Sequence, residues 1–339
     1  MADENPQNKI LVITWKIRLA LFAFCYGCEI SRRSNGTINR FIVTFFDHKS
    51  FPSKKPFNGV TTTDITIDKA RKHLWFRLYN PTPTGDSKLP VIFYFHGGGF
   101  GFCAPHSRPY NNFCYQLASK LSAIVISVNY RLAPEHRYPS PYDDGFDTLK
   151  FIDETTSILG FPSHANLKHC FLAGDSAGGN IVHHIMVKAS QHKFRNLNLI
   201  GAMLIQPFFG GEERTESELT LDRKVPFINM ERTDCVWKAF LPEGSDRDHP
   251  AANVFGPNAD DISGLNFPAS IVFVGGFDPL KDWQKRYYDG MKRCGKEVNL
   301  IEYSDTFHSF YVFPELAVFS LLIKDMKDFT QKQIVAAEK

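Results

Sequence analysis

From residue 91 onwards, the sequence alternates short apolar segments of strand character with longer segments of helical periodicity. A buried apolar strand followed by a helix is typical of a parallel sheet, because each connection has to cross one face of the sheet. The order therefore predicts an α/β fold with a mostly parallel central sheet and helices on both faces. The expected strands are 91–95, 123–130, 170–174, 200–206, 270–276 and 297–303, and the expected helices lie near 109–121, 141–154, from 178, from 281 and at 315–334.

The segments outside this alternation predict the strands at one edge of the sheet and the parts of the chain that cover the site. Residues 62–68 and 74–80 resemble antiparallel strands, which would lie at one sheet edge. Residues 208–256 interrupt the strand–helix rhythm and include a helical segment that contains a tryptophan. We predict one domain over residues 1–339, with an N-terminal helical lid at 1–45 and a cap insertion at 208–256.

The N-terminal segment 10–28 is apolar enough to resemble a signal peptide or a membrane anchor. Lys16 and Arg18 interrupt it, and the uncharged run from Leu19 to Cys25 is far shorter than the roughly 20 residues that a spanning helix needs. The residues before it include acids as well as one lysine, whereas a signal peptide begins with a basic region. We therefore expect an amphipathic helix that packs on the protein itself.

Charge and cysteine content argue against several classes of partner and cofactor. The net charge is +3 and no long run of Lys or Arg occurs, which argues against nucleic acid and a membrane as partners. The seven cysteines are an odd number, and the pair Cys25 and Cys28 has no second pair or histidine cluster that would complete a zinc site. Free thiols and the lack of an export signal predict a cytoplasmic protein without metal or cofactor. The sequence does not fix the oligomeric state.

The segment FLAGDSAGGN at 171–180 places a Gly-x-Ser-x-Gly motif between an expected strand and an expected helix. This context is typical of a nucleophile elbow, in which the serine hydroxyl stands above the sheet edge and flanking glycines avoid collisions across the turn. A phosphate-binding turn is the alternative, but no lysine follows as it does in a P-loop. We predict that Ser176 is a nucleophile, and we interpret Asp175 as a residue that stabilises the turn.

A serine nucleophile needs a base, and in this type of fold the partners follow in the chain order Ser, Asp, His. His308 lies five residues beyond the expected end of the last strand at Tyr303, and Asp278 lies at the carboxyl end of an earlier strand. Asp282 is also available, although it falls inside the following expected helix. We predict a triad of Ser176, Asp278 and His308, and we prefer Asp278 to Asp282 as the acid.

The segment HGGGF, which begins at His96, follows the first strand of the alternation. Acyl transfer passes through a tetrahedral oxyanion that preorganised donors must meet, and glycine amides can approach it closely because they carry no side chain. We assign the amides of Gly98, Gly99 and Ala177 to an oxyanion hole. His96 and Gly97 are expected to order the loop, and His96 is expected to take no part in proton transfer.

Together, HGGGF, YRLAPEHRYPSPYDDG, GDSAGGN, GGFDPLKD and FHSFY resemble the hormone-sensitive-lipase branch of the α/β-hydrolases. More closely, the chain resembles the plant carboxylesterases, a family that also contains the gibberellin receptor, and NGTINR at 35–40 extends the resemblance into the N-terminal lid. The resemblance implies an α/β-hydrolase fold whose lid closes over an acyl-binding pocket. Gibberellin receptors lack the catalytic histidine and typically read HGGS, so His308 and the sequence HGGG favour an enzyme.

These observations predict a serine carboxylesterase that hydrolyses a small carboxylic ester through an acyl-enzyme. Two alternatives stay open. One is a specialised-metabolism enzyme that acts on a plant alkaloid, by methyl ester hydrolysis with decarboxylation or by elimination or cyclisation. The other is a gibberellin-receptor-like protein that binds a small molecule and retains an unused triad.

The substrate depends on the shape of the pocket, which we expect the lid, residues 100–110 and the insertion at 208–240 to build. The partner is a small-molecule ester or alkaloid. Candidates for lining the pocket are Trp15, Phe22, Phe24, Phe102, Cys103 and Phe209. For the three lid residues among them, we prefer simple packing as the interpretation.

Overall fold

The computed structural model describes residues 11, 13–33, 36–67, 74–82, 85, 88–155 and 161–339. Its strands are β1 (Val60–Thr66), β2 (Trp75–Pro81), β3 (Leu89–Phe95), β4 (Ile124–Val128), β5 (Ala165–Asp175), β6 (Leu199–Ile205), β7 (Ala269–Phe277) and β8 (Val298–Phe307). Its helices are α1 (Trp15–Ser31), α2 (Arg40–Phe46), α3 (Arg108–Leu121), α4 (Ser140–Glu154), α5 (Ala177–Ser190), α6 (Glu216–Leu221), α7 (Met230–Phe240), α8 (Lys281–Arg293) and α9 (Ala317–Ala337). The predicted strands and helices are present, but β8 continues past Tyr303, so His308 follows the strand directly.

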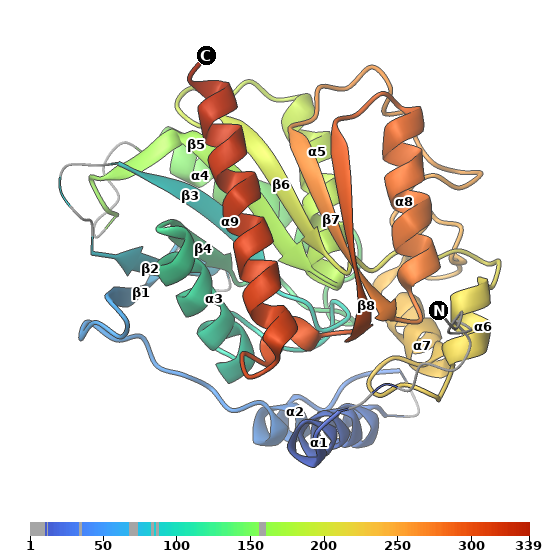
Figure 1. Cartoon of the computed structure of the whole chain (residues 1–339). Helices are drawn as coiled ribbons and strands as arrows, with labels where there is room; N and C mark the ends of the chain where they lie inside the picture. Colours follow the sequence, from blue (N-terminus) through green and yellow to red (C-terminus); the bar gives the residue numbers. More distant parts are fainter. Residues whose placement is uncertain are drawn as a thin grey trace, which may run out of the picture.

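The described strands form an eight-stranded sheet in the order β1-β2-β4-β3-β5-β6-β7-β8 (Figure 1). All neighbouring pairs from β4 to β8 along this order are parallel. The strands β1 and β2 pair antiparallel at one edge, and β2 joins β4 antiparallel. The predicted mostly parallel sheet with an antiparallel edge is confirmed.

Helices cover both faces of the sheet. Along β3, Val91 and Phe93 pack into the apolar cluster that includes α4, α5 and α8, whereas Ile92 and Tyr94 pack into the cluster that includes α3 and α9. This alternation follows from strand geometry, in which successive side chains point to opposite faces. Figure 1 shows α3 and α9 in front of the sheet and α4, α5 and α8 behind it. Burial on both faces explains why these strands are apolar throughout rather than alternating in polarity.

The helices α1 and α2 lie outside these layers, at the bottom of the view in Figure 1. Helix α1 packs on the protein through a face that includes Ile17, Leu21 and Cys25, as the sequence predicts. Its outer face is apolar as well, with Trp15 and Phe22 largely exposed. The expectation of an amphipathic helix is therefore wrong, because the charged residues of α1 do not separate an apolar face from a polar one.

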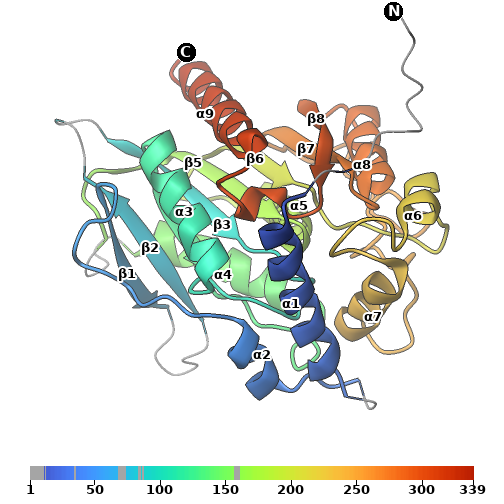
Figure 2. The same ribbon diagram turned by 60° about the horizontal axis from the view of Figure 1, so that its bottom comes forward.

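The segment between β6 and β7 carries α6 and α7, which lie beyond the carboxyl ends of these strands (Figure 2). Helix α6 begins at a capping box, in which the Thr215 hydroxyl accepts from the Glu218 amide and the Glu218 carboxylate accepts from the Thr215 amide. Helix α7 begins at Asn229, whose side chain accepts a hydrogen bond from the amide of Arg232. The two helices and the lid flank the same edge of the sheet, where the functional residues lie.

Candidate active site

Ser176 lies on the sharp turn between β5 and α5. Its backbone has φ 50° and ψ −118°, a conformation that residues with a side chain rarely adopt. The turn is tight, because a Cβ on Gly174 would lie 2.3 Å from the Gly178 oxygen, and a Cβ on Gly178 would lie 1.9 Å from the Phe95 oxygen. The elbow therefore requires glycine at both positions, and the strained turn presents Ser176 beyond the end of the strand.

Three side chains from separate strand ends meet at this edge of the sheet. His308 Nε2 lies 3.0 Å from Ser176 Oγ, and His308 Nδ1 lies 2.8 Å from Asp278 Oδ2. Ser176 follows β5, Asp278 follows β7 and His308 follows β8. All three residues are buried. The structure thus brings the predicted Ser176, Asp278 and His308 into one chain of hydrogen-bond contacts, with the distances that proton transfer requires.

The Asp278 carboxylate is held by two donors besides His308. The Leu280 amide donates to Oδ1 at 2.9 Å, and Gln284 Nε2 donates to Oδ2 at 2.8 Å. The alternative acid, Asp282, instead accepts a hydrogen bond from the Ser217 amide at 2.7 Å and so anchors the start of α6. A carboxylate facing Nδ1 favours the tautomer in which Nε2 is free to accept the serine proton.

Gln206, directly after β6, is a site residue that the sequence analysis missed. Its Oε1 accepts from the Ser309 amide at 2.9 Å, and its Nε2 donates to the Phe307 carbonyl oxygen at 3.3 Å. The buried amide therefore binds the backbone on both sides of His308. A polar residue at the carboxyl end of a buried parallel strand was the available signal, and the same signal pointed to Asp278.

Asp175 connects the elbow to the glycine loop. Its carboxylate accepts from the Gly97 amide at 3.0 Å, from the Tyr110 hydroxyl at 3.0 Å and from the Tyr94 hydroxyl. A Cβ on Gly97 would lie 2.4 Å from Asp175 Oδ2, so glycine is needed for this approach. Burial raises the pKa of Asp175 to about 6, although the tyrosine hydroxyls oppose the shift. Asp175 therefore does more than stabilise its own turn.

Three backbone amides near Ser176 are available as donors. Among the described residues, none accepts a hydrogen bond from the amide of Gly98, Gly99 or Ala177. Gly98 and Gly99 have φ values of 103° and 59°, and both line the same cavity as Ser176. Ala177 is the first residue of α5, where backbone amides have no partner within the helix. This is the arrangement that an oxyanion hole requires.

The His96 ring is buried and contacts the backbone of the glycine loop. Its Nδ1 lies 2.8 Å from the Gly97 carbonyl oxygen, and the ring stacks on Tyr130 with centroids 4.3 Å apart. The Tyr130 hydroxyl donates to the His96 carbonyl oxygen at 2.6 Å. Burial lowers the pKa of His96 to about 3, so the ring is neutral under ordinary assay conditions.

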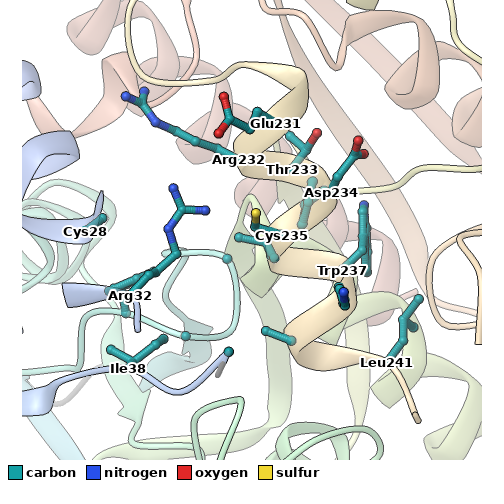
Figure 3. A pocket seen from close by; sticks show the side chains of 18 of the residues that line it. Cys28, Arg32, Ile38, Glu231, Arg232, Thr233, Asp234, Cys235, Trp237 and Leu241 are labelled. Carbon is teal, nitrogen blue, oxygen red and sulfur yellow. The ribbon is translucent and has the colours of Figure 1, made fainter. Parts of the chain in front are cut away.

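Ser176 lines a cavity of about 990 Å³ that extends between α1 and α7. Figure 3 shows Cys28 and Arg32 on the lid side and, on the other, a row of α7 side chains from Glu231 to Trp237, with Leu241 directly after the helix. The ring of Phe227, before α7, stacks over His308 with centroids 5.9 Å apart. The sequence analysis assigned the 208–240 insertion to the pocket, but it named neither Phe227 nor any single residue of α7.

The predicted pocket residues fall into two groups. Phe24 and Phe102 line the cavity. Trp15 and Phe22 lie on the outer face of α1, where they are 68% and 67% exposed, because they are about half a helical turn away from Phe24. Cys103 is buried but does not line the cavity. Phe209 lines a second cavity and stacks on Tyr287 with centroids 4.4 Å apart.

One arginine ties the lid to the segment that covers His308. Arg232 of α7 forms an ion pair with Glu29 of α1. The same guanidinium donates to the Phe227 carbonyl oxygen at 2.9 Å and contacts Cys25 Sγ at 3.3 Å. The ion pair therefore fastens α1 beside the Phe227 ring.

A second arginine ties the lid to the glycine loop. Arg40, the last residue of NGTINR, forms an ion pair with Glu135. Its guanidinium also donates to the Gly101 carbonyl oxygen and, at 2.7 Å, to the Ala133 carbonyl oxygen. Asn35 of this motif lies outside the described residues. The lid is thus linked to both sides of the predicted catalytic centre.

The described residues contain no group of His, Cys, Asp or Glu arranged to hold a metal ion. The seven cysteines are free, and burial raises the pKa of the Cys25 and Cys28 thiols, which argues against reactive thiolates at these positions.

Comparison with known proteins gives the following relatives. The family model described as "alpha/beta hydrolase fold" matches residues 92–312. A gibberellin receptor of Arabidopsis thaliana is 39% identical over 333 residues, which cover 94% of each chain. Carboxylesterase 20 of the same plant is 36% identical over 283 residues, which cover 80% of this chain and 85% of its own. A solved esterase of Pyrobaculum calidifontis shares the fold, with a TM-score of 0.73 and 22% identity over 96% of this chain and all of its own.

Proposed function

Because the chain belongs to the α/β-hydrolase family that includes plant carboxylesterases and gibberellin receptors, we propose that it is a serine carboxylesterase. The observation that supports this function most strongly is the chain of contacts from Ser176 Oγ to His308 at 3.0 Å and from His308 to Asp278 at 2.8 Å. A binding protein has no need to hold a serine, an imidazole and a carboxylate in this alignment.

In this mechanism His308 Nε2 accepts the proton of Ser176 Oγ as the oxygen attacks the ester carbonyl carbon. The negative charge that develops on the carbonyl oxygen is stabilised by the amides of Gly98, Gly99 and Ala177. Collapse of this intermediate breaks the ester C–O bond, and His308 gives its proton to the leaving alcohol. Water, deprotonated by His308, then attacks the acyl-enzyme, which releases the acid and restores the Ser176 hydroxyl. Asp278 stabilises the imidazolium in both halves of the cycle.

We also propose that the chain forms one domain, in which a lid at 1–45 and a cap at 208–256 cover the site. Two ion pairs support it, one between Glu29 of the lid and Arg232 of the cap and one between Arg40 of the lid and Glu135. The cavity of about 990 Å³ is near the upper end of the range for small-molecule sites. It offers room for an ester with a bulky acyl or alcohol group, and an alkaloid ester is one such substrate. Elimination or cyclisation on an alkaloid would use the same base and donors.

A small-molecule receptor is the second candidate, because the chain is more similar to the gibberellin receptor, at 39% identity, than to carboxylesterase 20, at 36%. Against it stands His308, since the resemblance to this family implies that receptors lack the catalytic histidine.

Labelling with a fluorophosphonate tests the proposed function. We expect the probe to modify Ser176, found by peptide mass spectrometry, and the protein to hydrolyse p-nitrophenyl acetate. Ser176→Ala should abolish both. Ser190→Ala, at the far end of the same helix, is the matched control and should change neither. A folded protein that is neither labelled nor active would support the receptor instead. Mass spectrometry of incubated alkaloid esters separates hydrolysis, which yields an acid or its decarboxylated product, from cyclisation, which yields an isomer.

A further inference from the structure

The outer face of α1 carries an apolar stripe that no described part of the protein covers. Its side chains recur every three or four residues, so they lie in one row along the helix. They are Trp15, Leu19, Phe22, Tyr26 and Ile30, with exposures of 68%, 58%, 67%, 48% and 43%. The opposite face of α1 already packs on the body of the protein. The stripe is therefore not needed to hold the lid in place.

Helix α2 widens the stripe into a patch. Phe41 and Phe45 of α2 are 83% and 73% exposed. The helices touch where Gly27 of α1 meets Phe46, because a Cβ on Gly27 would lie 2.6 Å from the Phe46 ring. Figures 1 and 2 both show α1 and α2 together at the margin of the molecule. We call the five stripe residues with Phe41 and Phe45 the lid face. Contiguous exposed apolar side chains in this number mark an interaction surface.

Positive charge is concentrated around the lid face. Residues 15–49 contain six lysines and arginines and two acids, a net charge of +4, whereas the entire chain carries +3. Both acids are engaged, Glu29 with Arg232 and Asp47 with Lys49, and one further cation, Arg40, is paired with Glu135. The sequence analysis argued against a membrane as partner from the net charge of the whole chain. That single number does not show that the positive charge is concentrated in this segment.

The positions of these cations distinguish between occupants. Lys16 and Arg18 lie on opposite sides of the stripe, each about 80° from its centre on the helical wheel. Arg32 and Arg33, at the other end of α1, line the cavity. A second copy packed in parallel against the stripe would bring Lys16 and Arg18 beside the same cations of its partner, which is unfavourable. The charge pattern therefore favours an occupant that is anionic where it meets these side chains and apolar between them.

We propose that the lid face docks on an anionic lipid bilayer, with α1 lying in the plane of the headgroup region. A helix face of Trp, Phe and Leu flanked by Lys and Arg is the pattern of helices that bind there. Figures 1 and 2 show α1 and α2 outside the layers of the body, at the margin of the molecule, where an extended surface can reach both helices. No helix within the described ranges has the length and apolarity to cross a membrane, so the attachment is peripheral.

Vesicle sedimentation tests this proposal on the full-length protein. We expect binding to phosphatidylcholine vesicles that contain phosphatidylserine, much weaker binding to phosphatidylcholine alone, and weaker binding at high salt. Lys16→Gln with Arg18→Gln should lower partitioning about fivefold per cation. Phe22→Ser with Phe41→Ser should lower it about tenfold or more. The matched control is Leu219→Ser with Val335→Ser, which changes residues 66% and 54% exposed on other surfaces and should leave binding unchanged.

Trp15 supplies a second readout. It is 68% exposed, whereas Trp237 and Trp283 are buried and Trp75 is partly buried. Docking moves the Trp15 indole into a less polar environment, so vesicles that contain phosphatidylserine should shift the tryptophan emission to the blue. Trp15→Phe should remove the shift while most sedimentation remains.

Absence of binding to either vesicle by the folded protein would overturn the proposal, as would binding that the Phe22→Ser, Phe41→Ser protein retains in full. A protein that ignores vesicles but binds an acidic polypeptide through these residues would make the lid face a protein-binding surface instead. The lid-face residues do not line the cavity, so hydrolysis of p-nitrophenyl acetate by the same variants reports separately on the proposed function.

Discussion

The carboxyl edge of the sheet and the lid are held in place by different kinds of contact. At the sheet edge, the buried Asp278 carboxylate accepts from the Leu280 amide in its own turn, from Gln284 of α8 and from His308 after β8, and all three bonds are buried. The lid is joined by a buried apolar face of α1, which includes Ile17 and Leu21, and by the Glu29–Arg232 and Arg40–Glu135 ion pairs, whose members are partly exposed. Buried polar networks fix geometry strongly, whereas apolar burial is not directional and exposed ion pairs contribute little and weaken with salt. The comparison indicates that directional contacts fix the reaction centre more precisely than they fix the lid.

Removing the base, His308, should have the largest effect on activity, because this residue accepts the proton of Ser176 and lies at the centre of the buried network. His308→Ala is expected to lower kcat/KM for p-nitrophenyl acetate about 10⁴-fold. Steady-state hydrolysis measures the loss, and thermal unfolding checks that the variant is folded. Activity within tenfold of the parent protein would show that the reaction does not pass through His308.

Asp175→Asn should change the pH dependence of stability. Burial raises the pKa of this carboxyl from 3.8 to about 6, so between these values the folded protein binds more protons than the unfolded chain. The stabilising contribution is complete below about pH 4 and is lost as the pH rises through 6, by about 3 kcal/mol in total. The asparagine variant has no such loss. From pH 4 to pH 7, the free energy of unfolding of the variant should therefore rise relative to that of the parent, by about the same 3 kcal/mol.

Urea unfolding at a series of pH values measures this difference. Asp260→Asn is a control, since this carboxyl is exposed, and its difference from the parent should be flat with pH. A difference between the Asp175 variant and the parent that is flat with pH would mean that Asp175 is ionised throughout the range in the folded protein.

Arg40→Ala tests the link between the lid and the glycine loop. Loss of the bonds to the Gly101 and Ala133 carbonyl oxygens should loosen the loop and lower kcat about tenfold, with KM changed less. Glu135→Gln removes the ion pair but leaves the guanidinium on both carbonyl oxygens, so it should retain nearly full activity. Equal losses in the two variants would show that the ion pair, rather than the loop contact, is what matters.

Glu29→Gln should have the smallest effect, because the ion pair it breaks is partly exposed. We expect KM to rise about threefold with kcat unchanged, because an exposed ion pair contributes less than about 1 kcal/mol to holding the lid in place. High salt should raise the KM of the parent protein toward that of the variant. A large fall in kcat would instead indicate that α1 supports the reacting groups directly.

Much of the site could be predicted because parallel strands end at one edge. Ser176, Asp278 and His308 each follow a strand, so their positions in the sequence already place them near one another. Gln206 obeys the same rule, but a glutamine has no distinctive role until the backbone on both sides of His308 is seen to bind it. The hydrogen bond from the Gly97 amide to the Asp175 carboxylate could not be predicted either, because it joins residues 78 positions apart.

The sequence by itself determined the order of strands and helices and the residues able to carry acyl transfer, since both follow from local periodicity and strand ends. Only the tertiary structure decided which side of α1 faces inward. Helical periodicity identifies a buried face when polar and apolar residues separate around the helix. In α1 they do not, so Trp15 and Phe22 were expected to be covered, by packing or in a cavity, but they lie on the outer surface, while Phe24 lines the cavity. Packing against the body of the protein determines which face of α1 is buried.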